Sequence, residues 1–172
     1  MAAPAGAQVG AVSIELRIKA AFLYNFARFI EWPAHVLEQQ PATIVVGILG
    51  RDPFGTILEQ TFRDKTVHGR TFEVRRIRSV PEITECHIVY VSPSEHRNVD
   101  SIVLAAAEGG VLTVSHLDEF AERGGMINFV LEDNRIRFEV NLLAAQQAGF
   151  RFHAQLLQLA RAVHREIRRR EK

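Results

Sequence analysis

Arg151 and His153, near the C-terminus, have the residue types and the spacing of a small binding site. The arginine offers a planar pair of donors for a carboxylate or phosphate group, and the imidazole adds a donor that becomes charged below neutral pH. Both precede an apolar pattern of helical spacing from Leu156 to Val163, so we expect them at a strand-to-helix junction, pointing outward. Alternatively, Arg151 neutralises a nearby acid and His153 caps the helix, and the sequence leaves both interpretations open.

The segment Gly47–Gly55 is the one place where a nucleotide-binding loop is conceivable, because it joins an apolar strand to a predicted helix start. It lacks the Lys-Ser/Thr pair of a phosphate-binding loop and the Gly-x-Gly-x-x-Gly spacing of a dinucleotide-binding turn. Asp52, at the expected N-cap, also places a negative charge where a phosphate needs donors. We interpret the segment as a structural turn, and a small Rossmann-like nucleotide-binding enzyme is the alternative function.

The sequence contains no other recognisable catalytic or metal-binding motif. The seven histidines are scattered without His-x-His or His-Glu-x-x-His spacing, so a metal site would need residues that only the fold brings together, and none is predicted. There is no Gly-x-Ser-x-Gly motif of a nucleophilic serine. Cys86 is the only cysteine, which excludes an intramolecular disulfide, and its apolar neighbours indicate a small buried side chain. We expect no enzymatic activity and no cofactor.

Length and composition are those of one soluble domain. The chain has 172 residues, 47% of them hydrophobic and 24% charged, which is enough for a core without disulfides or metals. A net charge of +1 gives no overall field for polyanions, and we expect no nucleic-acid partner. Basic residues gather at the C-terminus, as is typical of a solvated helix end; contact with anionic lipid or nucleic acid is the alternative. They are Arg161, Arg165, Arg168, Arg169, Arg170 and Lys172.

An α/β framework is expected to position the binding residues. Apolar residues at helical spacing predict a first helix over Ser13–Trp32, which Pro33 ends. The continuous apolar run Thr43–Gly50 is typical of a central strand that is covered on both faces. Residues 71–77 alternate enough to predict a strand near an edge of the sheet.

Three predicted strands are each followed by a capped helix. The caps are Asp52, opening a helix through Phe62; Ser92, opening a helix that ends at Gly109-Gly110; and Ser115, before a short helix closed by Gly124. This order is typical of a parallel sheet with helices on its faces.

The last two predicted strands, residues 126–131 and 135–140, flank a short polar turn and predict an antiparallel hairpin. We therefore predict a single α/β domain over residues 13–172. It has a mixed, mostly parallel sheet of about six strands, helices on both faces and a C-terminal antiparallel hairpin. Residues 1–12 are predicted to be a disordered or processed N-terminus.

Nothing in the sequence predicts a membrane span. No apolar run approaches the about 20 residues that cross a bilayer, and Met1–Gly10 lacks the apolar stretch of a signal peptide. The composition of Ala3-Pro4-Ala5-Gly6-Ala7 nevertheless suits the start of an exported protein whose signal peptide has been removed.

The chain resembles the YfiR family of small periplasmic proteins over nearly its whole length. The segments that carry the resemblance are Lys19–Phe26, Phe29–Pro33, Gly50–Gly55, Cys86–Val89, Gly124–Ile127, Arg137–Asn141 and Gln155–Leu157. The resemblance implies a periplasmic, non-enzymatic α/β protein, held as a homodimer, that represses an inner-membrane diguanylate cyclase by binding its periplasmic sensor part. Release of the cyclase would raise cyclic di-GMP and favour biofilm formation.

The same resemblance implies a small-ligand pocket formed by Arg151 and His153 near the end of the first helix, at Glu31-Trp32. The acidic Glu31 would suit an amino group on the ligand. Well-known members of the family carry disulfides, and with Cys86 alone this chain is not expected to be under redox control.

A partner surface is expected in the segment before and within the hairpin. Gly124 and Gly125 would allow close backbone approach, Met126 and Phe129 would supply adaptable apolar contact, and Arg137 is a further candidate. The alternative for Met126 and Phe129 is a place in the core. A periplasmic small-ligand binding module without a protein partner is a further alternative function.

Overall fold

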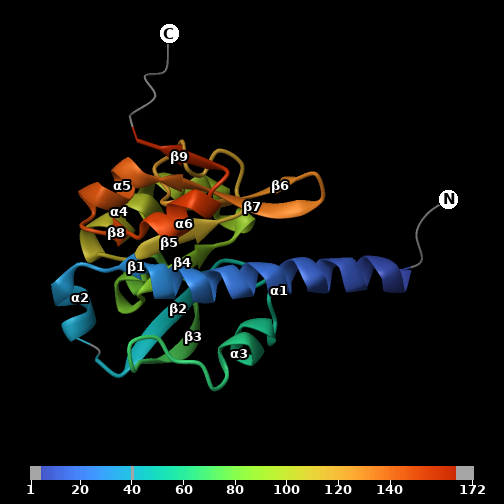
Figure 1. The fold of residues 1–172 in the computed structure, drawn as a ribbon, viewed down its shortest axis with the longest axis horizontal. Coiled ribbons are helices and arrows are strands. Elements are labelled where there is room, and N and C mark those ends of the chain that lie inside the picture. Colours follow the sequence, from blue (N-terminus) through green and yellow to red (C-terminus); the bar gives the residue numbers. More distant parts are fainter. Residues whose placement is uncertain (1–4, 40, 166–172) are drawn as a thin grey trace, which may run out of the picture.

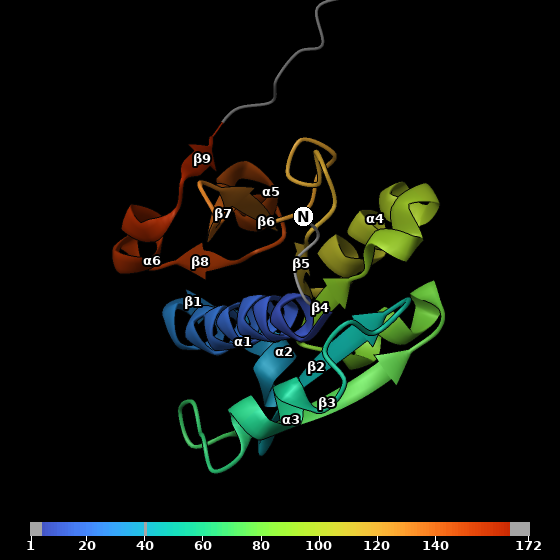
Figure 2. The same cartoon turned by 90° about the vertical axis from the view of Figure 1, so that its right-hand side faces the viewer.

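Figure 1 shows the computed structural model of the protein, which describes residues 5–39 and 41–165. A seven-stranded sheet has the order β3-β2-β4-β5-β6-β7-β9, and β1 and β8 form a second, two-stranded sheet. Helices cover both faces of the larger sheet (Figure 2). The predicted single α/β domain with a mixed, mostly parallel sheet is confirmed, although this sheet has seven strands instead of about six.

The elements have the following bounds. The strands are β1 (Ile30–Glu31), β2 (Thr43–Leu49), β3 (Thr71–Ile77), β4 (Ile88–Val91), β5 (Leu112–Ser115), β6 (Ile127–Glu132), β7 (Arg135–Asn141), β8 (Arg151–Phe152) and β9 (Ala162–His164). The α-helices are α1 (Ala5–Phe29), α2 (Ala34–Glu38), α3 (Ile57–Phe62), α4 (Val99–Gly109), α5 (Leu142–Gln147) and α6 (Ala154–Leu159). Two 3-10 helices, η1 (Val80–Glu85) and η2 (Pro93–Asn98), complete the fold.

The middle strands of the large sheet are buried on both faces. Strands β2, β4 and β5 run parallel to one another and consist almost entirely of buried residues. Side chains alternate between the two faces, so two separate cores form, one under α1, α3, α5 and α6 and the other under α4 and η1. Strand β3 is an edge strand, as predicted.

Helix α1 is held to the sheet by a cluster of phenylalanines. The ring of Phe26 stacks on Phe129 of β6 (centroids 5.8 Å apart) and meets Phe138 of β7 edge-on (5.2 Å). Phe22, one turn earlier, contacts the same two rings at 5.9 and 5.5 Å. Such aromatic pairs contribute beyond the apolar area that they bury. The N-terminal half of α1 continues past this cluster and extends beyond the sheet (Figure 1).

The predicted hairpin is confirmed as β6 and β7. Its two-residue turn consists of Asp133 and Asn134, which have φ angles of 51° and 60°. Positive φ at both central residues matches the right-handed twist of the strands, and Asn and Asp tolerate it better than other side chains.

Helix α1 differs from its predicted span at both ends. It begins at Ala5, and its first turns are rich in alanine, the strongest helix former. It ends at Phe29 because Ile30 and Glu31 are extended and pair with β8. Residues 5–12, expected to be disordered or removed, are helical in the structure, and their removal by processing stays a prediction.

One predicted helix begins later than expected and another is absent, because the backbone turns left-handed at Gly55 and Glu119. Gly55 has a φ of 56°, so the helix expected from Asp52 begins only at Ile57. Glu119 and Gly124 have φ angles of 61° and 100°, and residues 118–124 form turns where a short helix was predicted. A right-handed helix cannot continue through such residues.

The C-terminal helix is shorter than predicted. Helix α6 ends at Leu159, and Val163 belongs to β9, which pairs in parallel with β7. The backbone N–H of Arg161 donates to the carbonyl of Phe138 (2.8 Å), which directs the chain along the sheet edge. Of the basic C-terminal residues, Arg168, Arg169, Arg170 and Lys172 lie outside the described residues. No described helix is both long and apolar enough to span a membrane.

The aromatic cluster predicts an unequal response to truncation along α1. Phe26→Ala should lower the free energy of unfolding by about 3–5 kcal/mol, because it leaves a cavity between α1 and the sheet. Ile14→Ala, in the same helix but at a side chain that is 61% exposed, should change it by less than about 0.5 kcal/mol. Urea denaturation followed by circular dichroism measures both values, and equal losses would contradict this account of how α1 is held.

Candidate functional site

The small sheet of β1 and β8 brings the predicted ligand residues together. Glu31 lies opposite Arg151 in the register of the two strands. The Oε1 atom of Glu31 and the Nε2 atom of His153 are 3.3 Å apart, and both side chains are about half exposed. The backbone N–H of His153 donates to the carbonyl of Phe29 (2.9 Å), which links the end of α1 to the start of α6. A guanidinium, an imidazole and a carboxylate therefore share one patch of surface.

The predicted strand-to-helix junction is confirmed, because β8 ends at Phe152 and α6 begins at Ala154. His153 occupies the N-cap position of α6, yet its ring makes no capping hydrogen bond among the described residues. The ring instead faces Glu31 and packs edge-on against Phe29.

Trp32 lies behind this patch, in the interior. Its indole N–H donates to the carbonyl of His87 (2.9 Å), and its ring packs edge-on against Phe150. Together with Glu31, Trp32 lines a mainly apolar cavity of about 230 Å³. Glu31 thus belongs to both the polar patch and the cavity, whereas Arg151 and His153 do not line the cavity.

The predicted partner surface is mostly interior. Met126 and Phe129 are 2% and 1% exposed, so in this conformation neither side chain is available to a partner, and both belong to the core beneath α1. Gly125 is needed for packing, because a Cβ there would lie 2.1 Å from the ring of Phe120. Gly124 has a φ of 100°, a left-handed conformation that favours glycine, and it lies in the turn before β6.

The crevice where open α/β sheets usually bind nucleotides is closed. That crevice lies at the carboxyl ends of β2 and β4, on either side of which the chain connections diverge. Here the backbone N–H of Arg51 donates to Ser94 Oγ (3.0 Å), and that of Ser92 donates to the carbonyl of Leu49 (2.9 Å). A Cβ at Gly50 would lie 2.5 Å from Ser94 Oγ. The loop after β2 is therefore a structural turn packed against η2, as the sequence favoured.

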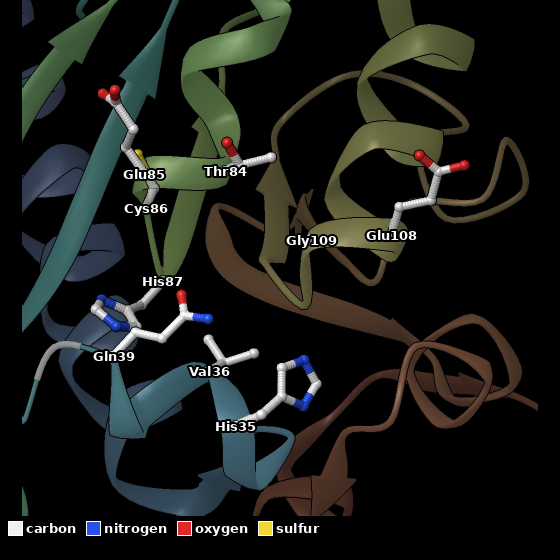
Figure 3. Close-up of a pocket in the computed structure, with 9 residues that line it drawn as sticks. All are labelled: His35, Val36, Gln39, Thr84, Glu85, Cys86, His87, Glu108 and Gly109. Atoms are coloured by element: carbon white, nitrogen blue, oxygen red, sulfur yellow. The ribbon is translucent and has the colours of Figure 1, made fainter.

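A polar hollow of about 270 Å³ lies at the opposite end of the sheet, where η1 leads into β4 (Figure 3). Residues from α2, η1 and the end of α4 line it, and they are His35, Val36, Gln39, Thr84, Glu85, Cys86, His87, Glu108 and Gly109. Its location at the amino end of β4 is not the one that α/β sheets use for nucleotides.

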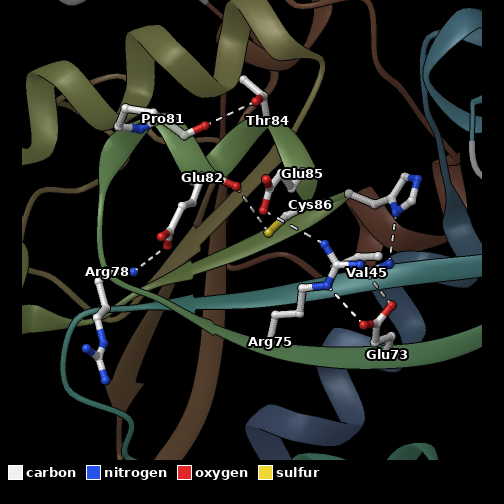
Figure 4. Close-up of polar contacts among 10 residues, drawn as sticks. Val45, Glu73, Arg75, Arg78, Pro81, Glu82, Thr84, Glu85 and Cys86 are labelled. Atoms are coloured by element: carbon white, nitrogen blue, oxygen red, sulfur yellow. Dashed lines mark hydrogen bonds and ion pairs between the residues drawn. The ribbon is translucent and has the colours of Figure 1, made fainter.

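Cys86 and His87 line this hollow and are both buried. Figure 4 shows the polar contacts around Cys86. Burial raises the pKa of the Cys86 thiol to about 11, so it is not an activated nucleophile. The backbone N–H of Val45 donates to His87 Nδ1 (2.8 Å), which requires this nitrogen to carry no proton. Burial, with a smaller effect of Arg70 and Arg75, lowers the pKa of His87. The expected role of Cys86 as a small buried side chain is confirmed.

The sequence analysis missed a buried charged side chain on α1. Lys19 is only 4% exposed, and its Nζ donates to Glu15 Oε1 (2.9 Å) one turn earlier. His116, after β5, approaches the same carboxylate at 4.0 Å, and its pKa is lowered by burial and by Lys19. The sequence could have indicated this ion pair, because Glu15 and Lys19 are four residues apart in an otherwise apolar helix.

Beyond these residues, α1 and the hairpin enclose an apolar groove of about 520 Å³, which we call the α1 groove. Its walls include Ile14, Ile18 and Phe22 from α1 and Leu131 and Ile136 from the hairpin. Ile14 and Leu131 are 61% and 59% exposed. Together with Ile18 they form a contiguous apolar lining, and apolar patches of this kind often mark interaction sites.

The buried His87 predicts a pH dependence of stability. Because its pKa is lower in the folded than in the unfolded protein, its contribution is complete above about pH 6.5 and is lost as pH falls toward the folded pKa. His87→Gln keeps an acceptor for Val45 without a titrating group and should flatten the dependence of unfolding free energy on pH between 7.5 and 5. Each unit of pKa lowering is worth about 1.4 kcal/mol. His35→Gln, in the same hollow but exposed, should leave the dependence unchanged; parallel curves for all three proteins would refute the assignment.

Comparison with known proteins gives the chain its family. The profile of the YfiR/HmsC-like family matches residues 16–161. No protein of curated function matches the chain significantly. A conserved domain protein from Vibrio cholerae O1 biovar El Tor is similar in structure, with a TM-score of 0.53, 11% identity and coverage of 75% of this chain and 57% of the other.

A domain from Streptococcus pneumoniae, solved in complex with L-Trp, is similar with a TM-score of 0.51, 14% identity and coverage of 75% of this chain and 58% of the other. The match therefore spans less than two thirds of either structure, and at these identities it shows a common fold only. The family profile, in contrast, covers most of the chain, from the middle of α1 to the residue before β9. The protein belongs to the YfiR/HmsC-like family.

Proposed function

We propose that this protein is a periplasmic regulatory protein that represses a membrane-bound diguanylate cyclase, or a related sensor, by docking on its periplasmic part. The α1 groove is the observation that carries this proposal. Membership of the YfiR/HmsC-like family supports a regulatory role in the periplasm rather than catalysis.

The α1 groove has the composition of a protein-binding surface. Its centre is apolar, with Ile18 and Leu131 on opposite walls, and Glu15 and Arg135 provide charged groups among its lining residues. An apolar centre with a polar rim is the usual arrangement of such interfaces. Ile14 and Ile18 are exposed and precede Phe22 and Phe26, whose rings anchor the helix to the sheet. This surface replaces Met126 and Phe129 as the proposed partner contact, while Arg137, half-buried on β7, stays a candidate.

In the proposed mechanism, docking holds the cyclase in an inactive arrangement. The repressor binds one of two conformations of the sensor and shifts its population toward that state. When an envelope signal weakens docking, the cyclase becomes active and cyclic di-GMP rises, which favours biofilm formation. We propose that the protein acts as a homodimer.

The docking proposal predicts a loss of binding when charge enters the α1 groove. Ile18→Glu and Leu131→Glu should weaken binding to the purified periplasmic part of the cyclase by at least about tenfold, because a carboxylate would have to be buried in the interface. Surface plasmon resonance measures the affinity, and the level of cyclic di-GMP in cells that carry each variant reports loss of repression.

Leu104→Glu is the matched control, because Leu104 on α4 is 61% exposed on the other side of the sheet. It should bind and repress like the wild type. Sedimentation of every variant shows whether self-association is affected separately. Repression that survives both groove substitutions would refute docking through this surface.

A second function, recognition of a small polar ligand, is favoured by the patch of Glu31, Arg151 and His153. Arg151 and His153 offer donors to a carboxylate, Glu31 offers an acceptor to an amino group, and the adjoining cavity has room for a small apolar side chain. The structurally similar domain from Streptococcus pneumoniae holds L-Trp, which supports the capacity of this fold for an amino acid.

The ligand proposal predicts thermal stabilisation by a free amino acid with an apolar side chain. At millimolar concentration, at least one member of a panel of L-amino acids should raise the melting temperature of the wild type, because a ligand that binds only the folded state stabilises it. Arg151→Ala should abolish this shift, whereas Arg97→Ala, at an exposed position of η2, should preserve it. A panel without any shift would exclude this ligand class.

A further inference from the structure

Three metal-ligating side chains from distant parts of the sequence meet at the far edge of the sheet. They are Glu122, Glu139 and His164, and one donor atom from each lies within 4.8 Å of the other two. Glu139 and His164 are largely buried, at 12% and 17% exposure, while Glu122 is exposed. The sequence shows no metal-binding motif here because the three residues come from different elements.

The backbone places these residues firmly. Strands β7 and β9 are hydrogen-bonded neighbours, and their register sets His164 opposite Asn141, two residues from Glu139. The side chain of Asn141 donates to the carbonyl of Ala121 (2.8 Å), which fixes the loop that carries Glu122 beside the end of β7.

Among the described residues, Glu139 accepts a hydrogen bond at only one of its two carboxylate oxygens. Arg161 donates to Oε1 (2.8 Å), whereas Oε2 lies 3.6 Å from His164 Nε2. That nitrogen is buried and has no hydrogen-bond partner in the described part of the chain. Arg161 also pairs with Glu132, so this guanidinium is shared between two carboxylates. An imidazole nitrogen without a hydrogen-bond partner, 3.6 Å from a carboxylate oxygen, has the arrangement that a shared cation would satisfy.

We propose that Glu122, Glu139 and His164 bind a divalent transition-metal ion, of which Zn²⁺ is the model. Zn²⁺ accepts imidazole nitrogen and carboxylate oxygen ligands at about 2.0–2.2 Å. Tetrahedral ligands at that range are about 3.4 Å from one another, close to the 3.6 Å between Glu139 Oε2 and His164 Nε2. The exposed Glu122 closes the site by rotating its side chain, and water completes the coordination.

The ion would join three separate pieces of the chain. It ties the short edge strand β9 to β7 through the side chains of His164 and Glu139, and it ties both to the loop of residues 118–124. Because the metal binds only where the three elements meet, it stabilises the folded edge of the sheet. None of its three residues lines the α1 groove, although β7 contributes residues to both, and the site does not depend on the proposed repressor function.

Isothermal titration of the full, untagged chain with ZnCl₂ tests the proposal. We expect one Zn²⁺ per chain with a dissociation constant below about 10 μM and a rise in melting temperature. Glu122→Gln should weaken binding at least about tenfold without unfolding the protein, because the side chain is exposed. His164→Gln should weaken binding at least as strongly.

Glu119→Gln is the matched control, because Glu119 is exposed in the same loop but outside the cluster, and it should bind Zn²⁺ like the wild type. X-ray absorption at the zinc edge should show nitrogen and oxygen ligands without sulfur, which distinguishes this site from Cys86. Absence of binding at 100 μM Zn²⁺, or full affinity in both Glu122→Gln and His164→Gln, would overturn the proposal.

Discussion

The burial of both faces of the central strands is the constraint on which the rest of this structure depends. Strands β2, β4 and β5 carry apolar side chains on both sides, so each face needs a cover of helices. Helix α4 with η1 provides one cover, and α1 with the shorter helices provides the other. The hydrogen-bonded strands and these two cores together leave little conformational freedom at the centre of the molecule.

The side chains that could bind a ligand or a partner therefore lie at the surface and not in the core. In the interior, the Cys86 thiol is kept protonated and His87 is kept neutral by burial and by its bond from Val45. The loops at the carboxyl ends of β2 and β4 are hydrogen-bonded to each other. Among the described residues, the open surfaces include the projecting part of α1, the β1–β8 patch, the hollow at the amino end of β4 and the edge at β9. These are surfaces for contact and binding, which agrees with a family of regulators.

Long elements with a strong pattern could be predicted, and short elements that exist only through pairing could not. The apolar run of β2, the hairpin and the edge position of β3 were all evident from residue type and alternation. Strands β1 and β9 have two and three residues, too few for any periodicity, and each is defined only by its pairing, β1 with β8 and β9 with β7. Left-handed residues such as Glu119 likewise ended helices that local propensity favoured.

Some of the candidate sites could likewise be predicted from the sequence, and others could not. The sequence alone determined the fold class, the absence of a nucleotide-binding or catalytic motif, and the outward junction that carries Arg151 and His153, because these depend on local pattern and on neighbours in the chain. Tertiary structure decided that Met126 and Phe129 are core, that Ile18 and Leu131 face each other across a groove, and that Glu122, Glu139 and His164 converge. The physical reason is that burial and contact between distant residues depend on strand order and register, which arise only when the two faces of the sheet are covered.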